Sequence, residues 1–311
     1  MPTAQLAHIG IGKESTWGTG VAPTVFLPGS EDVNIEIARL RIEGPHATLA
    51  QLRSDAGRKS VRGGMSGVPA YTDAMGHLLR ALLGAPTTTG SAAPYTHTFK
   101  ADTAPVAADH PRPPYSLQWT ADGVTRRYVG GQLSQIQFSQ PADDYLKLNL
   151  DWIFKDHQDG ASAATPTFPT DAVFGFRDLT VKRANSALGI RVESLELTIN
   201  NNLEPVEAVG ADTIAAVDIG TVTAEAQLTV EFNDAAVYND FVNDAAQRYD
   251  FIWTKGGKSF TVTFHRAVVA AHSQPIPASG RLTAAITLAA ELDPSTGGFV
   301  DVVLVNDTPS Y

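Results

Sequence analysis

Apolar and polar residues alternate along several stretches of the chain. The clearest run is Thr221 to Phe232, in which every second residue is apolar and the residues between are Thr, Glu or Gln. Shorter runs of the same kind cover residues 146–152, 195–199 and 260–265. Because successive side chains of a strand point to opposite faces, this period of two predicts half-buried strands. We therefore expect a mainly β protein with antiparallel sheets, each with one face exposed to solvent.

Two segments have a helical period instead. Thr72 to Leu83 and Asp234 to Gln247 each begin at a plausible capping residue and carry apolar residues at helical spacing, and the first is followed by Gly84. They predict one short helix in each half of the chain. The two apolar stripes are Met75, Leu78, Leu79, Leu82 and Val237, Tyr238, Phe241, Val242.

The two halves of the chain also resemble each other. Tyr115 to Gly123 (YSLQWTADG) recurs as Tyr249 to Gly257 (YDFIWTKGG), and Ser139-Gln-Pro141 recurs at the same offset as Ser273-Gln-Pro275. Repeated words at a fixed offset are typical of internal duplication. Chance recurrence in a chain rich in Thr, Ala and Gly, with turn residues that β proteins share, is the alternative.

A further pair of words sets the limits of the predicted copies. Ile35-Glu-Ile37 resembles Leu195-Glu-Leu197, and each half then runs strand, long loop, strand, helix, strand pair, final strand. We interpret this as a tandem duplication with copies at 33–155 and 191–293. The predicted division is an N-terminal arm (1–32), a first β domain (33–155), a linker and connecting hairpin (156–190), and a second β domain with a C-terminal strand (191–311). The segments outside the copies are of the kind that completes a neighbour's sheet.

Composition narrows the possible functions. The 33 acidic and 23 basic residues give a formal charge of −10, which argues against a broad basic face that grips nucleic acid. Cysteine is absent, which excludes disulfides, thiolate metal sites and Cys nucleophiles. No leader pattern and no run of about 18 apolar residues is present. We expect a protein that is made in the cytoplasm and is neither secreted nor membrane-spanning.

The motifs that suggest catalysis fail on inspection. Gly10 to Thr16 (GIGKEST) resembles part of a phosphate-binding loop, but Ala7 stands where the first glycine is required and Glu14 follows Lys13. The eight histidines show no HxH or HxxxH pairing that would place two ligands on one metal. The segment Gly64-Met-Ser-Gly67 lacks the second spacer of a nucleophile elbow. We expect no enzyme activity, no cofactor and no metal.

One basic cluster stands out in a loop between predicted strands, at residues 49–64. It is either a solvated loop or an arm that reaches an acidic surface of a neighbouring subunit. A DNA-binding patch is a weaker alternative because no aromatic residues interleave with the charges. The candidate inter-subunit residues are Arg53, Arg58, Lys59 and Arg62.

The polar faces of the predicted strands have two interpretations. They meet bulk solvent, or, if the sheets close into a tube, one of them lines the lumen. Carboxylates, amides and hydroxyls on such a wall would keep passing DNA from sticking. The candidate lumen-facing residues are Asp151, Glu196, Thr198, Glu225, Gln227 and Glu231.

The N-terminal hundred residues carry a family resemblance. Ile9 to Thr19 (IGIGKESTWGT), followed by Val21-Ala-Pro23 and Phe26-Leu-Pro28, resembles the start of the tail tube proteins of long-tailed bacteriophages. The basic loop, the first predicted helix and Tyr95-Thr-His-Thr-Phe99 are also similar to that family. The resemblance implies a β-sandwich or barrel with a flanking helix, whose strands join those of neighbours around a channel for DNA.

The resemblance also implies partners and a place. These are copies of the chain itself in stacked rings, a tape-measure protein, a tail terminator and tail-tip proteins, in the virion tail, with passing double-stranded DNA that is not specifically bound. Single-copy subunits of this family form hexameric rings, so two copies in one chain imply a trimeric, pseudo-hexameric ring. A hexamer with the second copy as an outward decoration domain is the alternative.

Three other kinds of protein remain open. One is a different β-rich virion component, such as a minor tail or decoration protein. Another is an enzyme of unknown type, which would need a pocket that the sequence does not indicate. The third is a carbohydrate-binding module, suggested by Trp17, Trp119, Trp152 and Trp253, although Trp119 and Trp253 occupy equivalent strand positions, where core packing is expected.

Overall fold

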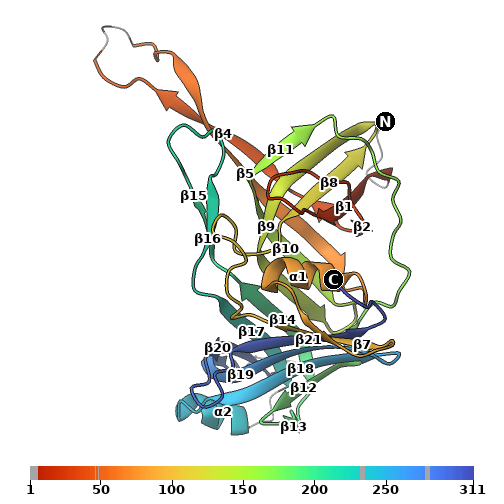
Figure 1. The fold of residues 1–311 in the computed structure, drawn as a ribbon. Helices are drawn as coiled ribbons and strands as arrows, with labels where there is room; N and C mark the ends of the chain where they lie inside the picture. Colours follow the sequence, from red (N-terminus) through yellow and green to blue (C-terminus); the bar gives the residue numbers. More distant parts are fainter. Residues whose placement is uncertain (1–5, 46, 48, 232–234, 277–280) are drawn as a thin grey trace.

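A computed structural model of the chain describes residues 6–45, 47, 49–231, 235–276 and 281–311. Antiparallel strands make up most of the described chain, and two α-helices pack against them (Figure 1). The prediction of a mainly β protein with one short helix in each half is confirmed. Neither helix in these ranges is long and apolar enough to cross a membrane.

The alternating segments are strands with one buried face. In β14 (Val192–Asn200), Leu195, Leu197 and Ile199 are buried, whereas Glu196 between them is exposed. The run predicted at 221–232 forms β17 (Thr223–Glu231) and pairs with β14, while Phe232 lies outside the described residues. Period-two alternation therefore located these strands and oriented their faces.

One central sheet joins the two halves of the chain. Its strands follow one another in space as β4, β5, β10, β9, β14, β17, β20 and β19. The short strand β3 pairs with the same edge of β5 as β4 does, farther along that edge. Within this sheet the first half of the chain meets the second where β9 pairs with β14. The new strands are β3 (Ser30–Glu31), β4 (Asn34–Arg41), β5 (Ser54–Pro69), β9 (Val124–Pro141), β10 (Lys147–Phe154), β19 (Lys258–Ser273) and β20 (Thr283–Glu291).

Two long strands leave this sheet and enter outer layers. The first part of β9 pairs with β8 on one edge and β11 on the other, and β1 and β2 follow β8. The first part of β19 pairs with β18 and β21, which continue into β12, β13, β7 and β6. The bounds are β1 (His8–Lys13), β2 (Val25–Phe26), β6 (Thr87–Thr89), β7 (Tyr95–Lys100), β8 (Tyr115–Ala121), β11 (Asp156–Asp159), β12 (Leu179–Arg183), β13 (Ser186–Ala187), β18 (Gln247–Lys255) and β21 (Val300–Asn306).

The two halves repeat these pairings in the same register. Trp119 and Trp253 occupy the same place in the hairpins β8–β9 and β18–β19. The next strand outward places Ile9 opposite Trp119 and Leu179 opposite Trp253. On the edge of β9 opposite to β8, β11 pairs with β9, and on the edge of β19 opposite to β18, β21 pairs with the equivalent residues of β19. The correspondence includes more of the chain than the segments at 33–155 and 191–293.

The terminal segments differ from the expectation. β1 and β21 complete sheets of their own chain, where they pair with β8 and with β19 and β7. The expected linker also begins later, because its first four residues form β11. Within the expected linker, the longest stretch without a strand lies between β11 and η2 (Phe176–Asp178), a 3-10 turn.

The helices differ in how well they are covered. α1 (Met75–Leu83) ends as predicted at Gly84, whose φ is 94° and whose N–H donates to the Arg80 carbonyl at 2.9 Å, and it packs between β9 and β7. α2 (Ala235–Val242) is shorter than predicted, because the chain is already in β18 at Gln247, and Asp234 lies outside the described residues. Of its apolar stripe only Val237 is buried, whereas the other three side chains are exposed to the extent of 46, 39 and 60% (Tyr238, Phe241, Val242).

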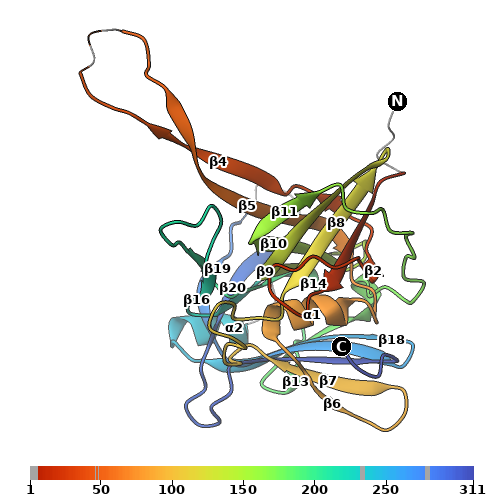
Figure 2. The same ribbon diagram turned by 45° about the horizontal axis from the view of Figure 1, so that its top comes forward.

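Two hairpins project beside the central sheet. The hairpin β4–β5, here called the arm, extends well away from the body at the upper left of Figures 1 and 2. Leu40, Ile42 and Leu49 on the arm are exposed. A smaller hairpin, β15 (Leu203–Val206) with β16 (Ala216–Ile219), connects β14 to β17.

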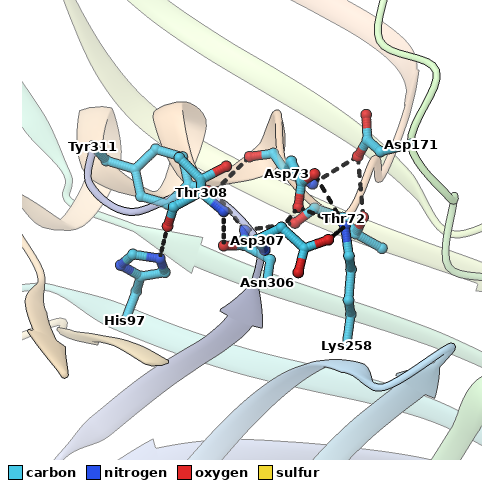
Figure 3. A network of polar contacts seen from close by, with 9 residues as sticks. All are labelled: Thr72, Asp73, His97, Asp171, Lys258, Asn306, Asp307, Thr308 and Tyr311. Carbon is cyan, nitrogen blue, oxygen red and sulfur yellow. Dashed lines mark hydrogen bonds and ion pairs between the residues drawn. The ribbon is translucent and has the colours of Figure 1, made fainter. Parts of the chain in front are cut away.

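A polar network fastens the C-terminus and the second half to the start of α1 (Figure 3). Lys258 Nζ, at the start of β19, lies 3.0 Å from both carboxylate oxygens of Asp73 and 2.9 Å from Asp307 Oδ2. The Tyr311 hydroxyl donates to the Asp73 carbonyl at 2.6 Å, and Asn306 Nδ2 donates to the Thr72 carbonyl at 2.8 Å. These contacts join segments more than 180 residues apart in the chain.

Candidate functional site

The solvent face of the central sheet is a continuous polar surface, here called the polar face. Residues opposite each other in a ladder share a face, so the pairings define rows across β10, β9, β14 and β17. The alternating neighbours, such as Leu150, Ile136 and Leu197, are buried on the other side. The three rows are Asp151, Gln135, Asn200, Thr223; Asn149, Gln137, Thr198, Glu225; and Lys147, Ser139, Glu196, Gln227.

Amide side chains link neighbouring strands on this face. Asn149 Nδ2 donates to Gln137 Oε1 at 3.1 Å, between β10 and β9. Asn200 Nδ2 donates to Gln135 Oε1 at 3.0 Å, across the β9–β14 junction. Gln137 Nε2 reaches Glu196 Oε2 at 3.4 Å across the same junction. Two amide–amide bonds and one amide–carboxylate bond therefore tie the side chains of β10, β9 and β14 together on the polar face.

The structure brings most of the predicted lumen residues together. Glu196, Thr198, Glu225 and Gln227 lie on adjacent strands of the polar face, and Asp151 lies on β10 in the adjoining row of the same face. Burial and the neighbouring Asp32 raise the pKa of the Asp151 carboxyl. Five of the six candidates thus form one surface.

Glu231 differs from the other five. It lies at the end of β17, where its carboxylate is 3.7 Å from Arg191 and 3.9 Å from Arg281. Within the three rows the only basic side chain is Lys147, whose Nζ contacts Asp144 Oδ2 at 2.5 Å. The rows therefore present amides, hydroxyls and carboxylates with little free positive charge, a surface with which phosphate groups interact unfavourably.

The expectation that the basic cluster lies in a loop is wrong, because Arg58, Lys59 and Arg62 belong to β5 and Arg53 directly precedes it. Arg53, toward the tip of the arm, contacts Asp55 at 2.7 Å and is exposed. Arg58 pairs with Glu207 of the loop between β15 and β16.

The other two members of the cluster lie farther along β5. Lys59 Nζ contacts Asp156 Oδ1 at 2.7 Å. Arg62 is exposed and lies opposite Asn34 and Ile153 in its two ladders. Arg58 and Lys59 thus anchor the base of the arm within the chain, and Arg53 is the member closest to the tip.

The polar face also includes residues of β9 that were not among the predicted candidates. Gln135, Gln137 and Ser139 alternate with the buried Ile136 and Phe138, which is the same period-two signal. The ladder between β9 and β10 shifts register at Ser134, and this bulge follows two glycines, so the alternating run is short. The run 135–140 alone would have identified the strand.

The glycine-rich N-terminal motif has a structural role, because its side chains join three strands by hydrogen bonds. The buried carboxylate of Glu14 accepts hydrogen bonds from Ser116 Oγ at 2.6 Å and from the backbone N–H groups of Gly18 and Gly130, each at 2.8 Å. Trp17 Nε1 donates to the Gly130 carbonyl at 2.9 Å. These residues fix the end of β1 against β8 and β9, and no strand-to-helix turn for a phosphate is present at the motif.

Other binding chemistry finds little support in the described ranges. No three His, Asp or Glu side chains there are placed to share a metal ion. Trp17, Trp152 and Trp253 are buried, and Trp119 is half-buried. The tryptophans therefore do not form the exposed aromatic face that a carbohydrate-binding module would need.

Comparison with known proteins agrees with this geometry. The family model described as phage tail tube protein matches residues 4–296. Comparison with curated proteins gave no match. The match spans the central sheet, both helices and the arm.

Proposed function

This chain belongs to the phage tail tube protein family, and we propose that it polymerises into stacked rings that form the tail tube, the conduit for DNA ejection. The observation that carries the proposal is the polar face, with amides and carboxylates in rows across four adjacent strands. In a closed tube this face lines the lumen, where like charge and neutral amides keep the DNA backbone from binding.

We further propose that one ring contains three chains with pseudo-sixfold symmetry. The support is the repeated pairing pattern, which suggests a tandem duplication with copies at about 8–159 and 179–306, wider than those drawn from sequence words. Inside one chain the copies are already joined edge to edge through β9 and β14. Three such chains supply six copies, the number that single-copy subunits place in a ring.

The proposed mechanism is passive. The subunit is a structural protein without catalytic activity, and its unpaired sheet edges are satisfied by neighbouring chains during assembly. The arm reaches the adjacent ring, where its exposed apolar residues and Arg53 are covered. A tape-measure protein, a tail terminator and tail-tip proteins are the further partners, all within the virion tail.

Negative-stain electron microscopy of the concentrated protein tests this function. The expected result is hollow rings or tubes wide enough for duplex DNA, with six lobes arranged as three pairs around the channel. Compact monomers that persist when native tail tips are added as nuclei would contradict the proposal, because a tube subunit must add to that template.

A further inference from the structure

We infer that each ring closes by pairing the free edge of β19, residues 268–273, with residues 30–34 of the next chain, in the register that β9 uses with β14. This inference rests on the proposed ring and names the contact that closes it. The partner is a second copy of this chain.

The first support comes from the edges of the two long strands. One edge of β9 carries β8 along its first part and β14 along its second part, while the other edge carries β11 and then β10. On β19 the corresponding neighbours are β18 on one edge, and β21 and then β20 on the other. Where β14 would lie, residues 268–273 have no partner strand in the described part of the chain, and Ala270, Ala271 and Ser273 are exposed.

The second support is a matching free edge in the first half. Among the described residues, β3 and β4 pair only with β5. The row Leu150, Met65, Glu31 crosses β10, β5 and β3, and the row Leu288, Ala226, Leu197 crosses β20, β17 and β14. We compare the strands outward from β10 in the first half with those outward from β20 in the second half. Residues 30–34 then hold the position in the first half that residues 196–200 hold in the second half. This alignment differs from the match of Ile35 to Leu195 that the sequence words suggest.

These correspondences fix the register of the proposed contact. Ser139 lies opposite Glu196 within the chain. Ser273 corresponds to Ser139 in the repeated word Ser-Gln-Pro, and Ser30 corresponds to Glu196. Ser273 should therefore lie opposite Ser30 of the next chain. The adjacent pair is His272 with Glu31 of the next chain, an imidazole beside a carboxylate.

The exposed side of α2 is an independent observation. Both helices carry an apolar stripe at helical spacing, but all four stripe residues of α1 are buried, whereas only Val237 of α2 is. At the junction of the two halves, Asn201 Nδ2, just after β14, donates to the Leu82 carbonyl of α1 at 2.7 Å. α2 packs beside the free edge of β19 as α1 packs beside β9. The ring of His272 stacks on the ring of Phe241, with 5.9 Å between the ring centroids. The next chain would cover these exposed apolar residues.

Engineered disulfides test the register, because the chain contains no cysteine. Opposite residues in an antiparallel ladder have Cβ atoms about 4.5–5.5 Å apart, close enough for a disulfide after small adjustment. The test variant is Ser30→Cys with Ser273→Cys. Ser139→Cys with Glu196→Cys is the matched control within one chain, and Glu36→Cys with Ser273→Cys tests the register of the sequence words.

After assembly and oxidation, a non-reducing gel of the test variant should show covalent dimers and trimers and no larger species. The control pair should crosslink within the monomer. Tubes that remain uncrosslinked while the control pair forms its disulfide, or tubes crosslinked by the Glu36 variant instead, would overturn the proposed contact and leave the tube function standing. A protein that forms neither tubes nor crosslinks, even with tail-tip nuclei, would overturn both.

Discussion

Ser139 of β9 lies opposite Glu196 of β14 in the ladder that joins the first half of the chain to the second. The ladder continues from residue 135 to residue 141 without a shift in register. On its buried side Phe138 lies opposite Leu197, and both side chains are in the core. The junction thus has the hydrogen bonding and packing of a continuous sheet, and it provides a pattern for the contact between chains.

The acidity of the polar face should be needed for DNA passage. The variant Glu225→Lys should assemble normal tails, because the side chain is exposed, but should slow DNA release roughly tenfold or more since a cation on each chain would hold phosphates at the wall. Glu204→Lys makes the same charge change on β15, away from the polar face, and is the control. Release kinetics from purified particles measure the effect, and equal rates for the two variants would contradict the lumen assignment.

The arm should be needed for stacking and not for folding. Replacement of residues 43–52 by an Asn-Gly turn removes the exposed tip and keeps the paired base of β4 and β5. We expect a folded protein with unchanged thermal unfolding that forms single rings and no tubes, as seen by analytical ultracentrifugation and electron microscopy. Tubes of normal length would show that the arm does not join successive rings.

The ion pair of Lys258 with Asp73 should contribute measurably to stability. Both side chains are largely shielded from solvent, so Lys258→Met should leave a shielded carboxylate without its partner and cost about 2 kcal/mol of unfolding free energy. Lys147→Met breaks the more exposed pair with Asp144 and should cost less than about 1 kcal/mol. Urea unfolding of the two variants compares these values, and equal losses would indicate that the network in Figure 3 adds little.

His77 should make stability depend on pH. Burial, with smaller effects of Arg80 and Lys13, lowers the pKa of its imidazole in the folded chain from 6.5 to about 4. Below pH 6.5 the unfolded chain therefore gains a proton that the folded chain does not take up until about pH 4. This group accordingly reduces stability as the pH falls between these values, by up to about 3 kcal/mol.

The variant His77→Gln isolates that contribution. Its unfolding free energy should fall less than that of the parent protein between pH 7 and 4, and the gap between the two slopes should close below pH 4. Parallel curves over the whole range would contradict the assignment to His77. Unfolding by urea at a series of pH values provides the measurement.

Period-two alternation predicted the strands whose two faces differ in polarity, such as β14 and β17. It missed the polar half of β9. A bulge at Ser134, just before the alternating residues, reverses which residues of the strand point to each face, so the alternation does not continue through it. The hairpins with Trp119 and Trp253 were recognised as equivalent because turn and core residues recur together.

The extent of the matching strand pairings was not readable from the sequence. Strands such as β1 and β12 pair in the same register, but their sequences share little beyond apolar character at Ile9 and Leu179. Backbone pairing places few demands on side-chain identity, so the register persists where sequence words do not. In the apolar stripe of α2 only Val237 is buried within the chain, and the remaining residues are those that we expect a neighbouring chain to cover.

A cryo-electron microscopy reconstruction of the assembled tube tests the central claim most directly. The account predicts three chains in each ring, with Gln137 of β9 and Glu225 of β17 on the wall of an open channel. A tube in which these residues lie on the outer surface, or a particle without a channel, would contradict it.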